Sequence, residues 1–143
     1  MGGKTHERLP YEVFVFVRRG GDYLVLHRSE RQGAYWHGVA GGLEEGETYA
    51  DAAVRELREE TGLDAPIVSL ERHVVYRLEE WEPRHRPEGG EIHVEFFLAE
   101  APAGWEPQLD WEHDDYRWCP AAEAVGLLFW PEPREVLEEL AAR

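Results

Sequence analysis

Hydrophobic residues along the chain follow two spacings, which together predict a mixed β-sheet combined with a few helices. Residues 11–17 and 23–28 are rich in aromatic and β-branched side chains and flank the Gly20–Gly21 turn, so we expect a hairpin. Further strands are predicted at residues 36–40, 67–78, 91–99 and 116–119. The 91–99 segment alternates, with Ile92, Val94, Phe96 and Leu98 on one side and His93, Glu95 and Phe97 on the other.

The strongest helical pattern covers residues 48–61. Thr48 is a suitable N-cap, Asp51 follows at capping-box spacing, and Gly62 suits a left-handed C-cap. The side of this helix that we expect to be buried consists of Ala50, Ala53, Val54, Leu57 and Thr61.

Residues 120–127 and 133–142 are the other predicted helices, each with a proline near its start. The order of elements is not a regular β-α alternation and no G-x-G-x-x-G or P-loop motif occurs, which disfavours a doubly wound fold. The predicted class is α+β, with a mixed sheet, one central helix and C-terminal helices.

The connecting segments are polar. Residues 29–34 are predicted to form a loop, and residues 81–90, with two prolines and two glycines, a mobile loop. Arg18 and Arg19 are expected to lie in a solvated hairpin turn.

Composition narrows the class of protein. A chain of 143 residues fits one domain over residues 1–143. Its net charge of −15 is typical of a soluble protein and the reverse of a nucleic-acid-binding surface, so no nucleic-acid partner is expected. Alternatively, an anionic substrate would have to meet divalent cations. No apolar run is long enough to span a membrane, and residues 1–10 lack the apolar stretch of a signal peptide.

The single cysteine, Cys119, excludes an intrachain disulfide, which fits a cytoplasmic protein. We interpret it as a buried packing residue rather than a nucleophile. The histidines show no H-x-H or H-E-x-x-H spacing, which disfavours a zinc site.

An acidic cluster in the predicted helix is the main indication of chemistry. Glu56 and Glu60 are an i,i+4 pair at the margin of the apolar stripe, and Glu59 lies further round the helix. Like charges at this spacing, and carboxylates in the last helical turn, both destabilise a helix. Such a local conflict is typical of a functional site, and clustered carboxylates favour Mg²⁺ or Mn²⁺. The alternative is a solvated acidic face.

The spacing over residues 41–63, G-x5-E-x7-R-E-L-x-E-E-x-G-L, decides between these alternatives, because it resembles the signature of the Nudix hydrolase family at every defined position. This resemblance implies an α/β/α sandwich with a central catalytic helix. It also implies divalent metals held by Glu56, Glu59 and Glu60, with the backbone carbonyl of Ala40. Glu47 and Arg55 match positions that orient the helix glutamates, so an ion pair between them is expected.

The reaction implied by the resemblance is attack of a metal-activated water on a phosphorus of a nucleoside diphosphate linked to another group. A nucleoside triphosphate or dihydroneopterin triphosphate pyrophosphatase is the first expectation. The alternatives are a dinucleoside polyphosphate, nucleotide-sugar or oxidised-nucleotide hydrolase, and a non-catalytic nucleotide-sensing domain. Glu59 or a carboxylate from a later loop would be the general base. The sequence does not decide whether the protein forms a homodimer.

A later segment, residues 111–118, resembles a Glu-His-x-x-Tyr-x-Trp element of the triphosphate branch of this family. On that resemblance Glu112 would be an additional metal ligand, whereas an ordinary polar loop is the alternative. The Gly41–Gly42 pair departs from the Thr-Gly-Ser expected in that branch. The predicted substrate-binding residues are Arg28, for phosphate or as the cap of a strand edge, and Tyr35, Trp36, Phe129 and Trp130, for stacking or for packing.

Overall fold

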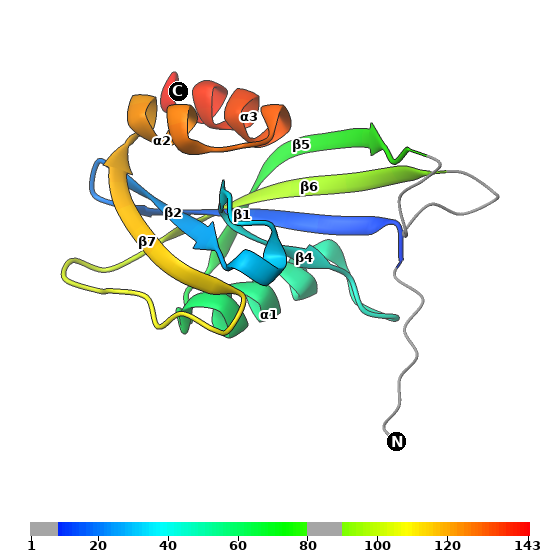
Figure 1. Cartoon of the computed structure of the whole chain (residues 1–143), viewed down its shortest axis with the longest axis horizontal. Coiled ribbons are helices and arrows are strands. Elements are labelled where there is room, and N and C mark those ends of the chain that lie inside the picture. Colours follow the sequence, from blue (N-terminus) through cyan, green and yellow to red (C-terminus); the bar gives the residue numbers. More distant parts are fainter. Residues whose placement is uncertain (1–8, 80–89) are drawn as a thin grey trace.

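The computed structural model describes residues 9–79 and 90–143, so most of the loop predicted at residues 81–90 lies outside the described residues. A β-sheet forms the middle layer, with helix α1 (Tyr49–Thr61) on one face and helices α2 (Ala121–Leu127) and α3 (Pro131–Ala141) on the other (Figure 1). The predicted α+β sandwich is therefore confirmed. None of the helices in the described part of the chain is long and apolar enough to cross a membrane.

The sheet contains both parallel and antiparallel neighbours in the order β3-β2-β1-β6-β5, while β4 pairs with β1 and β7 with β2. β1 and β6 run parallel, in register from Tyr11 opposite His93 to Arg18 opposite Glu100. The other pairs are antiparallel. The strands are β1 (Tyr11–Arg19), β2 (Asp22–Arg28), β3 (Trp36–His37), β4 (Val39–Gly42), β5 (Ile67–Arg77), β6 (Glu91–Glu100) and β7 (His113–Pro120).

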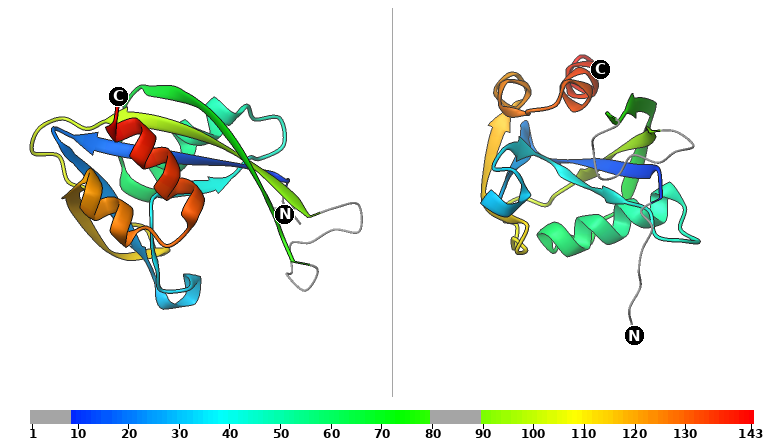
Figure 2. Two further views of the ribbon diagram at one scale, coloured as in Figure 1. Left: turned by 90° about the horizontal axis from the view of Figure 1, so that it is seen from above. Right: turned by 45° about the vertical axis from the view of Figure 1, so that its right-hand side comes forward.

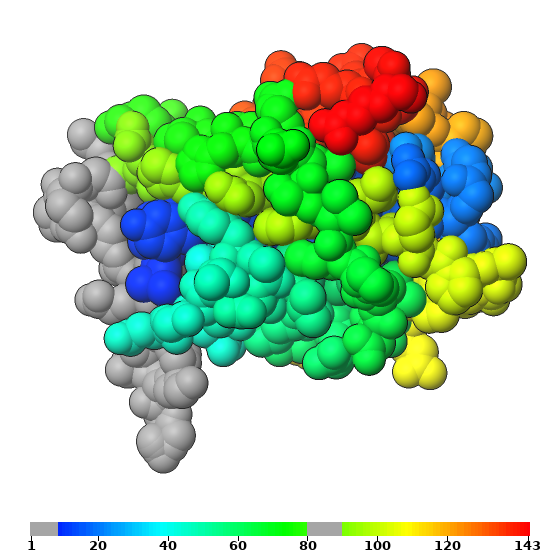
Figure 3. All heavy atoms as spheres, turned by 180° about the vertical axis from the view of Figure 1, so that it is seen from behind, coloured from blue at the N-terminus to red at the C-terminus, as the bar shows by residue number. Residues whose placement is uncertain are grey.

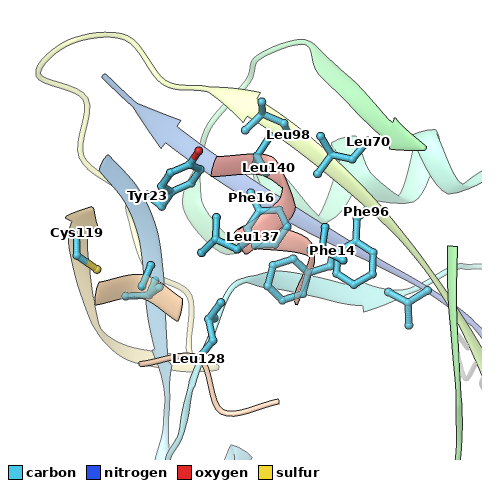
Figure 4. Packing of buried hydrophobic residues seen from close by; sticks show 14 of the residues in the cluster. Phe14, Phe16, Tyr23, Leu70, Phe96, Leu98, Cys119, Leu128, Leu137 and Leu140 are labelled. Atoms are coloured by element: carbon cyan, nitrogen blue, oxygen red, sulfur yellow. The ribbon is translucent and has the colours of Figure 1, made fainter. Parts of the chain in front are cut away.

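β1 is the central strand and is buried on both faces. Because side chains alternate along a strand, Val13, Val15 and Val17 pack in the core that α1 covers. Phe14 and Phe16 pack in the opposite core, with residues of α2 and α3 such as Leu137 (Figure 4). This double burial explains why the strand reads as a continuous apolar run.

α1 begins and ends as predicted. Thr48 and Asp51 form the reciprocal capping box, and Gly62 adopts φ 81° and donates its N–H to Arg58. The expected buried face was partly wrong, because Ala50 is exposed and Val54 is only half-buried. The buried side consists of Ala52, Ala53, Glu56, Leu57, Glu60 and Thr61, so the glutamates lie within it rather than at its margin.

Other element boundaries also need correction. α3 begins at Pro131, not residue 133, and α2 starts at Ala121 with Pro120 as its N-cap. β7 is longer than predicted because polar residues at its start pair with β2, including Asp115 opposite His27. A short 3-10 helix, Glu30–Gln32, interrupts the loop predicted at residues 29–34.

Arg18 and Arg19 do not lie in a merely solvated turn. Arg18 Nε donates to Glu100 at 2.8 Å, which ties β1 to the end of β6. Arg19 pairs with Glu106 at 2.8 Å and its guanidinium lies 4.1 Å from the centre of the Trp118 ring. Arg19 therefore anchors the segment that follows β6.

Candidate metal and catalytic site

Arg55 on α1 holds the loop before the helix against the helix itself. Its guanidinium donates to both carboxylate oxygens of Glu47, at 2.7 and 2.8 Å, and to the carbonyl of Gly42 at 2.9 Å. A further N–H donates to Glu56 at 2.7 Å. The expected Glu47–Arg55 ion pair is confirmed, and it is mostly shielded from solvent, with the Glu47 side chain 17% exposed. Arg55 thus fixes the position of the Glu56 carboxylate.

Gly41 lies directly against the carboxylate of Glu56. A Cβ at this position would lie 2.2 Å from Glu56 Oε2, which is much closer than atoms can approach. A larger residue at the first glycine of the motif would therefore displace the Glu56 carboxylate from this position. Gly46, with φ 86°, supplies the left-handed conformation in the loop that leads to α1.

Glu60 is the most deeply buried acid among the described residues, with 1% of its surface exposed. The backbone N–H of Ala40 donates to its Oε1 at 3.4 Å, and Oε2 has no hydrogen-bond partner. Burial, followed by the neighbouring Glu56 and then Glu112, raises the pKa of Glu60 well above its ordinary value. A buried carboxylate with a free oxygen and no cationic partner is electrostatically unfavourable unless a proton or a cation joins it.

Residues at the start of β7 and in the segment just before it complete the acidic side of the site. The His113 side chain is fully buried, its Nδ1 donates to Asp110 at 2.9 Å, and its Nε2 lies 3.7 Å from Glu60 Oε1. Burial lowers the pKa of His113, although Asp110 opposes this effect. Burial and then Asp110 raise the pKa of Glu112, whose carboxylate lies 4.0 Å from Arg28.

Glu59 differs from the other two helix glutamates because its side chain is 56% exposed. Its carboxylate lies 3.4 Å from Arg55, and its pKa is raised by partial burial and then by the charge of Glu56. Glu59 therefore stands at the solvent side of the cluster, as its position on the helix predicted.

In the described ranges, 9–79 and 90–143, no three acidic, histidine or cysteine side chains already form a coordination sphere. The available donors are nevertheless the hard carboxylate oxygens that Mg²⁺ and Mn²⁺ prefer. The unpartnered Oε2 of Glu60, next to Glu56, is the feature of this site that a divalent cation would satisfy.

Three of the four predicted aromatic residues come together beside Arg28. The rings of Tyr35 and Phe129 lie 5.2 Å apart, and Trp130 packs edge-on against Phe129 at 5.0 Å. The guanidinium of Arg28 lies 5.6 Å from the Tyr35 ring and is held by Gln32 at 2.7 Å. Phe129 and Trp130 remain 58% and 45% exposed. Arg28 thus connects the acidic residues to an accessible aromatic surface.

Trp36 lies apart from these aromatic side chains. It packs against His27 at 5.0 Å and under Arg117 at 5.3 Å, and it lines a hollow of about 440 Å³ with His27, Asp114 and Asp115. Neighbouring residues of an extended segment point to opposite sides, which explains why Tyr35 and Trp36 separate.

No functional role was predicted for Asp110, His113 or His37. His37 packs edge-on against Phe14 at 4.9 Å, and its Nδ1 is buried without a hydrogen-bond partner. Burial, then the charge of Arg28, lowers the pKa of His37 to about 3, so its ring is neutral. The position of His113 directly after Glu112 could have indicated a role for His113. His37 lies in a segment without a charge pattern, so nothing in the sequence pointed to it.

Residues 8–140 match the NUDIX domain. RNA pyrophosphohydrolase of Rhizobium meliloti is 34% identical, over 96% of this chain and 95% of that protein. Dihydroneopterin triphosphate diphosphatase of Escherichia coli is 29% identical, over 97% of this chain and 96% of that protein. A match to octanoyltransferase of Myxococcus xanthus, 34% identical over 83% of this chain, spans only 32% of that longer protein.

The fold has a close counterpart among solved structures. The structure of the E. coli dihydroneopterin triphosphate pyrophosphohydrolase superposes with a TM-score of 0.82, with 24% identity, over 94% of this chain and 97% of that one. The chain belongs to the Nudix family and is a hydrolase of the pyrophosphohydrolase type. Members of this class act on small nucleotide-like substrates.

Proposed function

We propose that this enzyme hydrolyses a phosphoanhydride bond of a small nucleoside triphosphate-like substrate with the help of Mg²⁺ or Mn²⁺. The observation that carries the proposal is the Glu60 carboxylate, which is buried beside Glu56 and retains an unpartnered oxygen. A sequence optimised for folding alone would not bury an acid in this way.

In this proposal Glu56 and Glu60 hold the cation, with Glu112 contributing from the segment before β7 and Ala40 from its backbone carbonyl. Ala40 already contacts Glu60 through its N–H, and Glu112 already influences the pKa of Glu60. When bound, the cation would lower the pKa of a water molecule and offset the charge of the phosphate oxygens.

The remaining motif residues would position these ligands and move a proton. Arg55 holds Glu56 in place and is itself held by Glu47. We assign the role of general base to Glu59, because its side chain reaches solvent and its raised pKa brings it closer to neutrality than that of an ordinary glutamate. If Glu59 also binds metal, the base would come from the segment containing Glu112.

For the substrate we propose that Arg28 contacts a phosphate and that Tyr35, Phe129 and Trp130 bind the ring. Arg28 lies between Glu112 and Tyr35. Its side chain can therefore contact a phosphate of a substrate whose phosphoanhydride lies at the acidic residues and whose ring lies on the aromatic surface. Trp36 is left out of this set because it lies elsewhere. The name of one relative, dihydroneopterin triphosphate diphosphatase, supports a triphosphate substrate.

A panel of substrates with Mg²⁺, with pyrophosphate and orthophosphate release measured separately, tests this assignment. Nucleoside triphosphates and dihydroneopterin triphosphate should release pyrophosphate. Preferred hydrolysis of a dinucleoside polyphosphate, nucleotide sugar, oxidised nucleotide or triphosphorylated RNA would replace the proposed substrate class. The absence of turnover on the whole panel would favour a nucleotide sensor.

Glu60→Gln tests the role of the acid cluster. Loss of this ligand should lower kcat at least about a hundredfold. Glu138→Gln is the matched control, since Glu138 is exposed on α3. Equal activity of Glu60→Gln and wild type would refute the proposed site.

A further inference from the structure

Two histidines and a glutamate form a cluster on strands β5 and β6, outside the acidic site. His73 on β5 lies directly opposite Glu95 on β6, while His93 lies two positions along β6, opposite Val75. His73 Nδ1 is 2.9 Å from Glu95 Oε2, and His73 Nε2 is 2.8 Å from His93 Nδ1. The two ring nitrogens therefore face each other across a hydrogen bond, and a carboxylate fixes the ring of His73.

The cluster is accessible and framed by aromatic rings. The His73 side chain is 42% exposed and that of Glu95 is 33% exposed. Tyr49 packs edge-on against His73 at 6.2 Å, and Tyr11 lies 5.9 Å from the ring of His93. The beginning of β1, the segment leading into α1, and strands β5 and β6 meet on one face of the molecule (Figure 3).

This cluster is separate from the acidic site. Tyr49, which contacts His73, is the first residue of α1, whereas Glu56 and Glu60 follow seven and eleven residues later. At about 1.5 Å per residue, these glutamates lie about 10 and 16 Å further along the helix axis. Neither histidine has a contact with Glu56, Glu60 or Glu112 among the interactions of the described residues.

The distance between the two nitrogens indicates which coordination geometry a bound metal ion would need. With metal–nitrogen bonds of about 2.0–2.1 Å, two nitrogens 2.8 Å apart subtend about 85–90° at the metal. A tetrahedral ion such as Zn²⁺ needs about 3.3 Å between its ligands, whereas a right angle suits the tetragonal coordination of Cu²⁺ or Ni²⁺. We propose that His73 Nε2 and His93 Nδ1 form a surface site for a tetragonal divalent transition-metal ion, Cu²⁺ or Ni²⁺.

Glu95 sets the tautomer and the orientation of the His73 ring. Because its carboxylate accepts the Nδ1 proton of His73, the lone pair of the neutral ring lies on Nε2, the atom that faces His93. Without metal, His93 Nδ1–H can donate to that lone pair. Metal binding would replace this hydrogen bond. The proton would leave Nδ1 as His93 becomes the Nε2–H tautomer, both rings would turn so that their lone pairs point at one ion, and water would fill the other coordination positions. The bound ion would join β5 to β6.

Calorimetric titration of the untagged protein with Ni²⁺, in excess Mg²⁺ to fill carboxylate sites, tests the proposal. His73→Ala and His93→Ala should each weaken binding at least about tenfold, and Glu95→Gln about tenfold through the orientation of His73. His27→Ala is the matched control, because His27 is also a half-buried histidine bonded to a carboxylate, at 2.7 Å from Asp114. It should bind Ni²⁺ as wild type does.

Electron paramagnetic resonance of the Cu²⁺ complex gives the ligands directly. Wild type should show a tetragonal spectrum with coupling to two imidazole nitrogens, and His73→Ala and His93→Ala should each lose that signature. Glu60→Gln should retain it, which separates this site from the catalytic one. The proposal is overturned if both histidine variants bind Ni²⁺ as tightly as wild type, or if the wild-type spectrum lacks two equatorial nitrogens.

Discussion

The two helical layers pack on the same sheet but bury different kinds of side chain. On the α2 and α3 side, the core consists of aromatic and aliphatic residues, with Cys119 among them. On the α1 side, the helix buries Glu56, Glu60 and Thr61 alongside small apolar residues. Figure 2 shows the two helical layers on opposite sides of the strands.

Because of this difference, the residues that stabilise the fold and the residues of the proposed site lie mainly in different layers. The α2 and α3 layer follows the rules of a hydrophobic core, and burial raises the pKa of the Cys119 thiol to about 11, which leaves it unreactive near neutrality. The α1 layer departs from those rules at the two glutamates that we assign to metal binding. The α2 and α3 layer therefore stabilises the fold. The α1 layer is less stable than an apolar layer would be, because it buries the two glutamates of the site.

Substitutions in the apolar layer should have the largest effect on stability. Leu137 is completely buried on α3, so Leu137→Ala should lower the free energy of unfolding by about 2–5 kcal/mol through lost contacts and a cavity. Denaturant unfolding measures this change. The kcat per folded molecule should stay unchanged, and a large loss of kcat in the folded fraction would show that the layers are not separable.

Glu60→Gln should have the opposite effect on stability in the metal-free protein. Because the folded-state pKa of Glu60 is raised, its favourable contribution is present below the ordinary pKa of about 4.5 and is lost as pH rises through the folded-state pKa. Removing the buried charge should stabilise the protein by about 1 kcal/mol or more at pH 8.

The gain from Glu60→Gln should shrink towards zero near pH 4.5. Unfolding in the presence of a chelator measures it, and added Mg²⁺ should stabilise wild type more than the variant. A variant less stable than wild type at pH 8 without metal would contradict the idea that Glu60 is kept for function.

Glu47→Gln should have the smallest effect and the reverse pH dependence. Hydrogen bonds from Arg55 lower the pKa of Glu47, so its contribution to stability is present above about pH 4.5 and is lost as pH falls through the lowered pKa. The variant should be less stable than wild type by about 1 kcal/mol at pH 7. Unfolding curves at pH 7 and pH 3 should show the difference decreasing at the lower pH.

Much of the fold could be predicted because local signals coincide with tertiary packing. The capping box and the glycine C-cap fix α1 within the sequence itself, and the alternation of β6 matches its two cores. β7 was underestimated because His113 and Asp115 gain their strand conformation from pairing with β2, which a single segment does not reveal. α3 begins at Pro131, where the missing N–H costs nothing. The prediction placed this start two residues too late because Pro133 is equally suited to the beginning of a helix.

The positions of the acidic residues could be predicted from the motif, whereas their surroundings could not. Motif spacing indicated Glu56 and Glu60, but their burial depends on Gly41 and on the approach of Asp110 and His113 from a distant segment. The His73–His93 pair has no sequence spacing at all, because the register of two antiparallel strands brings it together.

The parallel pairing of β1 with β6 has a consequence for how the chain acquires its structure. Arg18 and its partner Glu100 are 82 residues apart, so the central strand gains this neighbour only after most of the chain has been synthesised. Non-local parallel pairs form slowly, and an open strand edge is prone to association in the meantime. Glu56 and Glu60 therefore leave the ribosome well before the sheet that will bury them is complete, because β5, β6 and β7 all follow α1 in the chain.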